Sequence, residues 1–377
     1  MPQRGAVVEY RGVTKRFRGG TVALDDLSLQ VPAGTICALV GPSGGGKTTA
    51  LKVVNRLIEP TAGQVLIDGK DVLREDPVPL RRRVGYVIQQ VGLFPHRTIA
   101  ENVATVPELL GWDRSRISDR VQELLVLVGL DPASYSARYP AQLSGGERQR
   151  VGVARALAAE PPVMLMDEPF GAVDPIVRER LQDEFLRIHD RLAMTVLFVT
   201  HDIDEAIKMG DRVAVLRAGR LVQYAPPAEL LERPADEFVA RFVGADRGLK
   251  RLALISVGDL ELRQVRTARE GERVAGTAGD PHALLLDAAG RPAGWVNLAR
   301  AGGRALERSM ADPSSPLFAR STRVRDALSL LMASGVRTGV AVDDDGRYVG
   351  VITLEDLVSL LGQGQPAGAP AAQAGTA

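Results

Sequence analysis

Residues 41–49, GPSGGGKTT, decide the fold of this chain. They follow the apolar run ICALV, which is typical of a buried strand, and precede an amphipathic helical pattern at residues 50–58. A strand, a loop with the spacing G-x-x-x-x-G-K-[ST] and a helix, in this order, predict a phosphate-binding loop. Glycine lets backbone N–H groups approach a polyphosphate, and the start of the helix adds its own unpaired N–H groups. We expect Lys47 to reach the β- and γ-phosphates and the Thr48 hydroxyl to bind Mg²⁺. The loop residues expected to hold the phosphates are Gly41, Pro42, Ser43, Gly44, Gly45, Gly46, Lys47, Thr48 and Thr49.

The bulk composition sets broad limits. A length of 377 residues predicts two or three domains, with 45% hydrophobic and 25% charged residues typical of a globular protein. The net charge of +1 gives no electrostatic case for nucleic acid as a partner. The single cysteine, Cys37, excludes an internal disulfide. No apolar run approaches the ~20 residues that cross a bilayer, so we expect any membrane role to depend on a partner.

Two acidic residues end another apolar run, VMLMDEP at residues 163–169. Ligands of open α/β sheets bind at the carboxyl ends of the strands. Asp167 is therefore expected to hold Mg²⁺, and Glu168 to orient or deprotonate the water that attacks the γ-phosphate. A further predicted strand at residues 195–200 brings His201 to the same edge.

Two weaker signals accompany these motifs. LSGGE at residues 143–147 precedes a helical pattern at residues 148–159 and predicts a second anion-binding helix start. Phe17 lies just before the predicted hairpin turn at residues 18–20. It either stacks on an adenine ring or packs as an ordinary aromatic residue.

Residues 98–130 are expected to be mostly helical, with a capping box from Thr98 to Glu101 at their start.

Together these motifs resemble the ATPase subunit of ABC transporters over residues 7 to about 243. The resemblance implies ATP and Mg²⁺ as ligands and an α/β fold with a mixed-sheet core, a helical subdomain and an antiparallel β subdomain. Glu147 is a departure, because most members have glutamine there. The matching positions are Phe17 (adenine stacking), residues 41–49 (Walker A), Gln89 (Q-loop, ATP and Mg²⁺), Ser144, Gly145, Gly146 and Glu147 (signature), Asp167 (Walker B, Mg²⁺), Glu168 (catalytic glutamate), Asp174 (D-loop) and His201 (switch histidine).

The resemblance also implies a mechanism. A head-to-tail homodimer would sandwich ATP between the phosphate loop of one copy and the signature helix of the other, excluding water. The loop at residues 89–96 would transmit the movement to two transmembrane permease subunits, with Leu93 and Phe94 as exposed contacts. QQVGLFPH at residues 89–96 and VPELLGW at residues 106–112 resemble the importers of quaternary amines and osmoprotectants, such as glycine betaine, choline, carnitine and proline. These work with an extracytoplasmic substrate-binding protein, and the ATPase lies peripherally at the cytoplasmic face of the membrane.

A second domain is expected at residues 246–361, after an ATP-binding domain at residues 1–245. The segments at residues 282–296 and 340–353 both predict a strand, an Asp/Gly turn and a strand, each followed by a helical pattern, which indicates two copies of one unit. They resemble tandem CBS modules, with the second copy at about 311–361. The first copy is degenerate, because residues 269–279 are a poor helix. Residues 362–377 are rich in Gly, Pro, Ala and Gln and are expected to be disordered.

The sequence does not determine which ligand or signal the second domain responds to. Thr353 and Asp356 match the pair that binds ribose in nucleotide-binding CBS modules. The domain could bind an adenyl nucleotide such as cyclic di-AMP, sense ionic strength at the membrane surface, or only promote dimerisation.

Three other functions compete with this one. They are a non-transport ABC ATPase, a non-enzymatic nucleotide sensor, and a transporter ATPase that serves amino acids instead.

Overall fold

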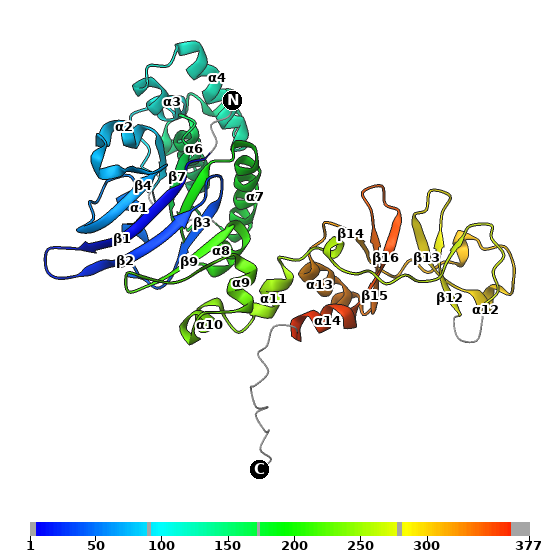
Figure 1. Ribbon diagram of the computed structural model, residues 1–377. Helices are drawn as coiled ribbons and strands as arrows, with labels where there is room; N and C mark the ends of the chain where they lie inside the picture. The colour runs from blue at the N-terminus through cyan, green and yellow to red at the C-terminus, as the bar shows by residue number, and fades with distance from the viewer. Residues whose placement is uncertain (1–4, 89–91, 172–173, 277–280, 363–377) are drawn as a thin grey trace. The chain divides into compact units, whose positions relative to one another are not determined.

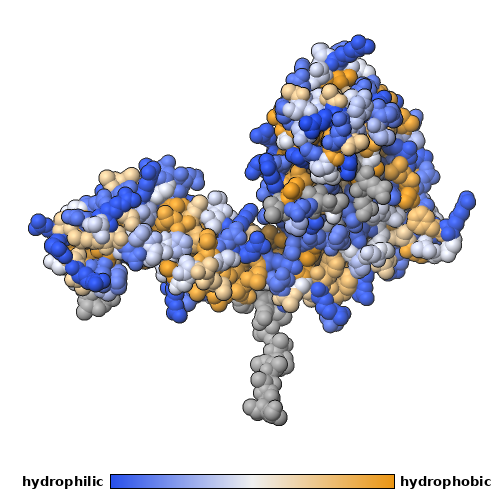
Figure 2. All heavy atoms as spheres, turned by 180° about the vertical axis from the view of Figure 1, so that it is seen from behind, coloured by the Kyte–Doolittle hydropathy of each residue, from blue (hydrophilic) through white to orange (hydrophobic). Residues whose placement is uncertain are grey.

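The computed structural model describes residues 5–88, 92–171, 174–276 and 281–362 (Figure 1). The chain divides into two compact units, residues 1–242 and 243–377, and each is described by itself. On the face drawn in Figure 2, hydrophobic residues are interspersed with hydrophilic ones. In the described part of the chain, no helix is long and apolar enough to cross a membrane.

The first unit is built on a mixed sheet with the strand order β10-β9-β3-β8-β7-β6. All neighbouring pairs are parallel except β9 and β10. The apolar runs predicted as strands are fully buried in β3, β7 and β8, as expected for strands covered on both faces. The strands are β3 (Ile36–Val40), β6 (Val84–Val87), β7 (Val163–Asp167), β8 (Thr195–Val199), β9 (Arg212–Arg217) and β10 (Arg220–Ala225).

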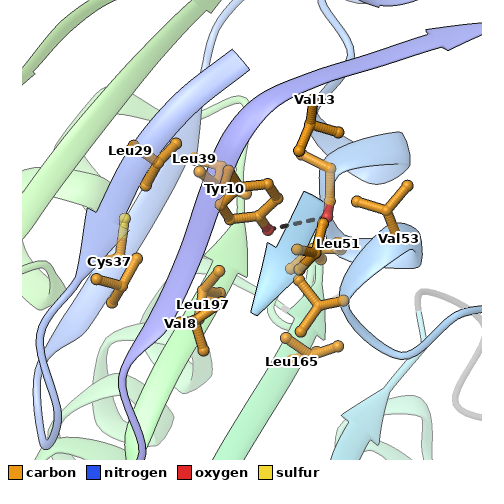
Figure 3. Close-up of a cluster of buried hydrophobic side chains, with 14 of the residues drawn as sticks. Val8, Tyr10, Val13, Leu29, Cys37, Leu39, Leu51, Val53, Leu165 and Leu197 are labelled. Atoms are coloured by element: carbon orange, nitrogen blue, oxygen red, sulfur yellow. Dashed lines mark hydrogen bonds between the residues drawn. The ribbon is translucent and has the colours of Figure 1, made fainter. Parts of the chain in front are cut away.

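A second, antiparallel sheet has the order β2-β1-β4-β5. It contains the predicted hairpin of β1 (Val8–Arg16) and β2 (Val22–Val31), followed by β4 (Ala62–Ile67) and β5 (Lys70–Asp71). One hydrophobic cluster joins this sheet, the central sheet and the first helix (Figure 3). Within it the Tyr10 hydroxyl donates a hydrogen bond to the Ala50 carbonyl at 2.9 Å. Cys37 packs in the same cluster, and burial raises the pKa of its thiol to about 12.

Helices connect and cover these sheets. The capping box of Thr98 and Glu101 is present, as predicted. The predicted helical block at residues 98–130 is broken near Gly111, whose φ of 73° ends the first helical segment. The helices are α1 (Lys47–Val54), α2 (Pro77–Arg82), α3 (Ile99–Leu109), α4 (Arg114–Leu127), α5 (Pro132–Tyr135), α6 (Gly145–Leu157), α7 (Pro175–Leu192), α8 (Ile203–Met209), α9 (Pro227–Glu232) and α10 (Glu237–Val243).

The start of helix α6 was predicted wrongly, at residue 148. It begins at Gly145, because the Ser144 hydroxyl accepts the Glu147 N–H and caps the helix three residues earlier.

The second unit repeats one arrangement twice. Each half has a three-stranded sheet in which the first two strands are parallel and the last two are antiparallel. The second half has a helix between its first two strands, whereas residues 270–276 of the first half form none, as their composition predicted. The elements are α11 (Arg247–Leu252), β11 (Thr267–Arg269), β12 (His282–Leu286), β13 (Pro292–Asn297), α12 (Leu298–Ala301), β14 (Leu317–Ala319), α13 (Val324–Ser334), β15 (Thr338–Val342), β16 (Tyr348–Thr353) and α14 (Leu354–Gly362).

Candidate functional site

The loop between β3 and α1 can be formed only with glycine at two positions. Gly41 has a φ of 143°, and a Cβ atom there would lie 2.0 Å from the Leu216 carbonyl oxygen of β9. Gly46 has a φ of 96°, and its Cβ atom would lie 2.3 Å from the Ala23 carbonyl oxygen. Any side chain at these positions would clash with backbone, so the loop keeps the tight path that a phosphate requires.

Lys47 folds over this loop. Its Nζ donates hydrogen bonds to the carbonyl oxygens of Gly41 at 2.7 Å and Pro42 at 2.8 Å, and the residue is 8% exposed. Burial lowers the pKa of Lys47, and the nearby carboxylates of Glu168 and Asp167 oppose this shift. A desolvated ammonium held at the loop is suited to pair with phosphate oxygens.

A hydroxyl and a carboxylate meet beside the loop. Thr48, on the first turn of α1, donates from Oγ1 to Asp167 Oδ1 at 3.0 Å. Asp167 is buried at the end of β7, and this desolvation raises its pKa, while the hydrogen bond from Thr48 lowers it. Magnesium ions that bind nucleotides take one or two protein oxygens and leave the other positions to water and phosphate. The pair fits such an ion, although the described residues contain no group of three or more His, Cys, Asp or Glu side chains that could hold a metal by themselves.

Glu168 and His201 lie together next to this pair. The Glu168 N–H donates to the Val199 carbonyl at 3.0 Å, which ties the residue to the neighbouring strand β8. Its φ of 48° is a conformation that residues other than glycine rarely adopt. His201 Nδ1 lies 3.6 Å from Glu168 Oε1, which is too long for a direct hydrogen bond. Both side chains retain access to solvent, so water can reach the carboxylate.

The predicted second anion-binding position is the start of α6. Ser144 and Glu147 form a reciprocal capping box. Tyr135 donates to Glu147 Oε1 at 2.6 Å, and this bond together with the bonds from Ser144 lowers the pKa of Glu147 to about 2. Among the described residues, no hydrogen bond connects the start of α6 to the phosphate loop at residues 41–49.

The remaining predicted residues of the first unit are only partly defined. Phe17 is 41% exposed at the tip of the β1–β2 hairpin, with Lys15 Nζ 5.3 Å from its ring centre. Asp174 is exposed just before α7. Gln89 and residues 172–173 lie outside the described residues.

In the described part of the loop predicted to contact the permease, an exposed aromatic residue is held in place by a buried asparagine. Phe94 is 40% exposed, whereas Leu93, which we expected to be exposed, is half-buried. Asn102 is fully buried below it and hydrogen-bonds both the N–H and the carbonyl of Phe94. No sequence motif assigned a role to Asn102. The only available signal was a polar residue on the apolar face of α3.

In the second unit, Thr353 and Asp356 form a closed pair. Asp356 Oδ2 accepts from the Thr353 N–H at 3.0 Å and from its hydroxyl at 2.7 Å. Asp356 also forms an ion pair with Arg263. Desolvation acts to raise the pKa of Asp356, but the bonds from Thr353 and Arg263 outweigh it and hold the pKa below its ordinary value.

Distant residues thus converge at the carboxyl ends of three adjacent strands: the loop after β3, Asp167 and Glu168 of β7, and His201 after β8. The hydrogen bond from Thr48 to Asp167 joins two of these side chains, and the carboxylates of Asp167 and Glu168 lie near the buried Lys47 ammonium. Together they form one site that can hold a metal-bound polyphosphate and a water molecule.

Comparisons with known proteins agree with this geometry. An ABC transporter family model matches residues 24–171, and a CBS domain model matches residues 311–363. The osmoprotectant import ATP-binding protein OsmV of Salmonella typhimurium is 47% identical over 95% of this chain and 97% of that protein. The choline transport ATP-binding protein OpuBA of Bacillus subtilis is 40% identical over 94% of this chain and 96% of that protein.

A solved structure is similar to part of this chain. A dimeric post-hydrolysis structure of the ATP-binding cassette MJ0796, bound to ADP and Pi, is 33% identical with a TM-score of 0.54 and covers 58% of this chain and 98% of that chain. The family match, the full-length relatives and the converging site lead to one conclusion: this chain belongs to the ATP-binding proteins of ABC transporters.

Proposed function

We propose that this chain is the ATP-hydrolysing subunit of an importer for quaternary amines and related osmoprotectants, such as glycine betaine, choline, carnitine or proline. The observation that carries the hydrolytic part is the meeting of the phosphate loop, Asp167 and Glu168 at one sheet edge. The cargo class is supported by relatives that align over nearly their whole length and are named for osmoprotectant, choline and carnitine transport.

Each site residue has a distinct task in this proposal. The N–H groups of residues 41–49 and the Lys47 ammonium bind the phosphates, and Phe17 contacts the adenine. Thr48, Asp167 and Gln89 hold Mg²⁺, which when bound neutralises charge on the phosphates. Glu168 orients the attacking water and accepts its proton, and its access to solvent and its anchorage to β8 suit that role. His201 lies beside Glu168 and helps to position the water and the γ-phosphate.

Two copies of the chain complete the site. Ser144, Gly145, Gly146 and Glu147 of the second copy cover the γ-phosphate of the first, and Asp174 contributes at the same interface. The similar cassette MJ0796 was solved as a dimer, which supports an arrangement in trans. Closure excludes water from the phosphates, and hydrolysis removes the shared ligand and favours reopening.

The dimer acts on two permease subunits, and in this proposal residues 89–96 form the contact. Phe94, exposed and fixed from below by Asn102, is the described residue best suited to it. An extracytoplasmic binding protein delivers the cargo, and the chain lies at the cytoplasmic face of the membrane.

The second unit is proposed to be a tandem CBS regulatory domain at residues 246–361, following an ATP-binding domain at residues 1–245. The repeated sheet topology supports a diverged first copy beside the one that the family model matches.

The variant Glu168→Gln tests the hydrolytic assignment. We expect it to bind ATP, to accumulate as a dimer in the presence of ATP, and to hydrolyse ATP at least about 100-fold more slowly, because a general base typically contributes that much. Glu229→Gln on α9 is the matched control and should hydrolyse ATP at the wild-type rate. Near-normal phosphate release by Glu168→Gln would reject Glu168 as the base.

The cargo is tested in proteoliposomes that contain the complete transporter. We expect ATP-dependent uptake of a radiolabelled quaternary amine, competed by unlabelled glycine betaine or choline but not by leucine. Uptake of leucine without uptake of any quaternary amine would refute the cargo class while leaving the ATPase assignment intact.

A further inference from the structure

A buried acid that none of the steps above uses follows His201 four residues later in the chain. Glu205, on α8, is 7% exposed and is therefore almost fully withdrawn from water. Its Oε1 accepts a hydrogen bond from the side-chain amide of Gln182 on α7 at 3.1 Å, and Gln182 is itself 5% exposed. The Thr200 hydroxyl supplies a second side-chain hydrogen bond to the carboxylate. Burial raises the pKa of Glu205, and these two bonds act against that shift.

Glu205 is bonded to both neighbours of His201 in the chain. Its carboxylate holds Thr200, whose Oγ1 also accepts the Asp202 N–H at 3.0 Å. The Glu205 N–H donates to Asp202 Oδ1 at 3.4 Å, and this aspartate caps the start of α8. The backbone on either side of His201 is therefore fixed by bonds that involve Glu205.

Helix α7 joins this network from a second direction. Besides the bond from Gln182, Arg178 Nη1 lies 3.7 Å from Asp202 Oδ2. The Arg178 N–H donates to the Asp174 carbonyl at 2.8 Å, at the start of the same helix. The segment that carries His201 and the segment that carries Asp174 are thus both held to α7.

Stability alone does not explain a carboxylate at this buried position. Removing a carboxylate from water is costly, and hydrophobic residues of similar volume often replace buried charges without loss of stability. The carboxylate provides what a hydrophobic side chain cannot, namely directed bonds to Thr200 and Gln182. Such bonds matter beside a reacting group, where a small displacement is costly, and His201 Nδ1 lies 3.6 Å from Glu168 Oε1.

We propose that Glu205 is a positioning residue for ATP hydrolysis. Through its bonds to the residues on either side, it holds His201 beside Glu168, and through Gln182 it ties this position to α7. The inference rests on the proposed function, in which His201 helps to position the water and the γ-phosphate. Glu205 itself contacts neither of them and affects the reaction only through His201.

The test is steady-state ATP hydrolysis by the complete transporter, with kcat and the KM for ATP measured separately. Glu205→Leu removes both side-chain bonds with little change in volume. We expect its kcat to fall by about tenfold or more, since a displacement of about 1 Å can cost about 100-fold. Its KM should stay unchanged, because the phosphate loop at residues 41–49 keeps its contacts. Glu205→Gln still offers an acceptor to Thr200 and a polar group to Gln182, so its kcat should stay within about twofold of the wild type.

Lys208→Met is the matched control on the same helix. It removes a surface ion pair between Lys208 and Asp183 at 2.8 Å, which also joins α8 to α7 but involves neither neighbour of His201. Its kcat should equal that of the wild type. A loss as large as that of Glu205→Leu would show that any link between the two helices matters, and would overturn the proposal.

His201→Ala separates positioning from a general loss of structure. If Glu205 acts through His201, the double variant of Glu205→Leu and His201→Ala should hydrolyse ATP no more slowly than His201→Ala alone. A general defect would make the two losses multiply. If Glu205→Leu melts early, Thr200→Val, which deletes one hydroxyl and keeps the branched shape, replaces it with the same expectations.

The proposal is overturned by wild-type kcat in Glu205→Leu, by Glu205→Gln as slow as Glu205→Leu, by a raised KM in place of a lowered kcat, or by losses that multiply in the double variant. Slow hydrolysis by His201→Ala beside normal hydrolysis by Glu205→Leu would overturn this inference alone. Wild-type kcat in His201→Ala would reject the role of His201 in the proposed function, and this inference with it.

Discussion

Asn102 offers the sharpest quantitative prediction from this structure. Its side chain is fully buried and has four hydrogen-bond partners. Oδ1 accepts the Phe94 N–H at 2.7 Å, and the two hydrogens of Nδ2 are shared among the carbonyls of Phe94, Arg97 and Thr98 at 3.1, 3.1 and 2.9 Å. One side chain thus holds the whole turn that carries Phe94 against the start of α3.

The variant Asn102→Ala removes the contacts with all four partners. The accepted bond and the two hydrogens of the amide amount to three full hydrogen bonds, and at about 1 kcal/mol net for each we expect a loss of about 2–3 kcal/mol. For a unit of this size, 1 kcal/mol shifts Tm by roughly 2–4 °C, so we expect the first unit to melt about 5–10 °C lower. Asn102→Asp keeps the acceptor but places a carboxylate against three carbonyls, and should lose at least as much.

The assay is thermal unfolding followed by circular dichroism, together with transport by the reconstituted complex. Glu108→Ala, on the exposed side of the same helix, is the control, because it removes only an exposed ion pair with Arg97 at 3.3 Å. ATP binding should survive in Asn102→Ala while transport falls, since the platform for the permease is loosened. A melting temperature equal to that of Glu108→Ala would refute the reasoning.

Three further predictions concern the first unit. Lys47→Ala should abolish binding of a fluorescent ATP analogue, whereas Lys70→Ala on the exposed β5 should bind it normally; unchanged affinity in Lys47→Ala would reject the phosphate-loop assignment. The pKa of Glu147 is lowered to about 2 from 4.5, so its carboxylate stabilises the fold above about pH 4.5 and this stability is lost as the pH falls toward 2. Urea unfolding at about pH 7 and about pH 3.5 should therefore show a smaller loss for Glu147→Gln than for the wild type, and equal losses would contradict the shift. Tyr10→Phe should lower the free energy of unfolding by about 1 kcal/mol by removing the buried bond to Ala50, and no change in urea unfolding would show that bond to be unimportant.

The sequence by itself determined the local features, whose formation depends on residues close together in the chain. The spacing of residues 41–49 determines the phosphate loop, because its glycines and the following helix act within a single turn. The capping box that begins at Thr98 follows equally from residues three positions apart, whereas the one that begins at Ser144 was recognised only in the structure. The repeated strand, turn and strand of the second unit was also predictable, since each turn lies between its own two strands.

Only the tertiary structure decided which distant groups meet. The strand order β3-β8-β7 places Thr48 within 3.0 Å of Asp167, which is 119 residues away in the chain, and no local pattern fixes that order. Asn102 became significant only when its burial below Phe94 was visible. The bond between Gln182 and Glu205 joins two helices in the same way, because packing between distant segments, rather than local propensity, decides which polar groups are buried together.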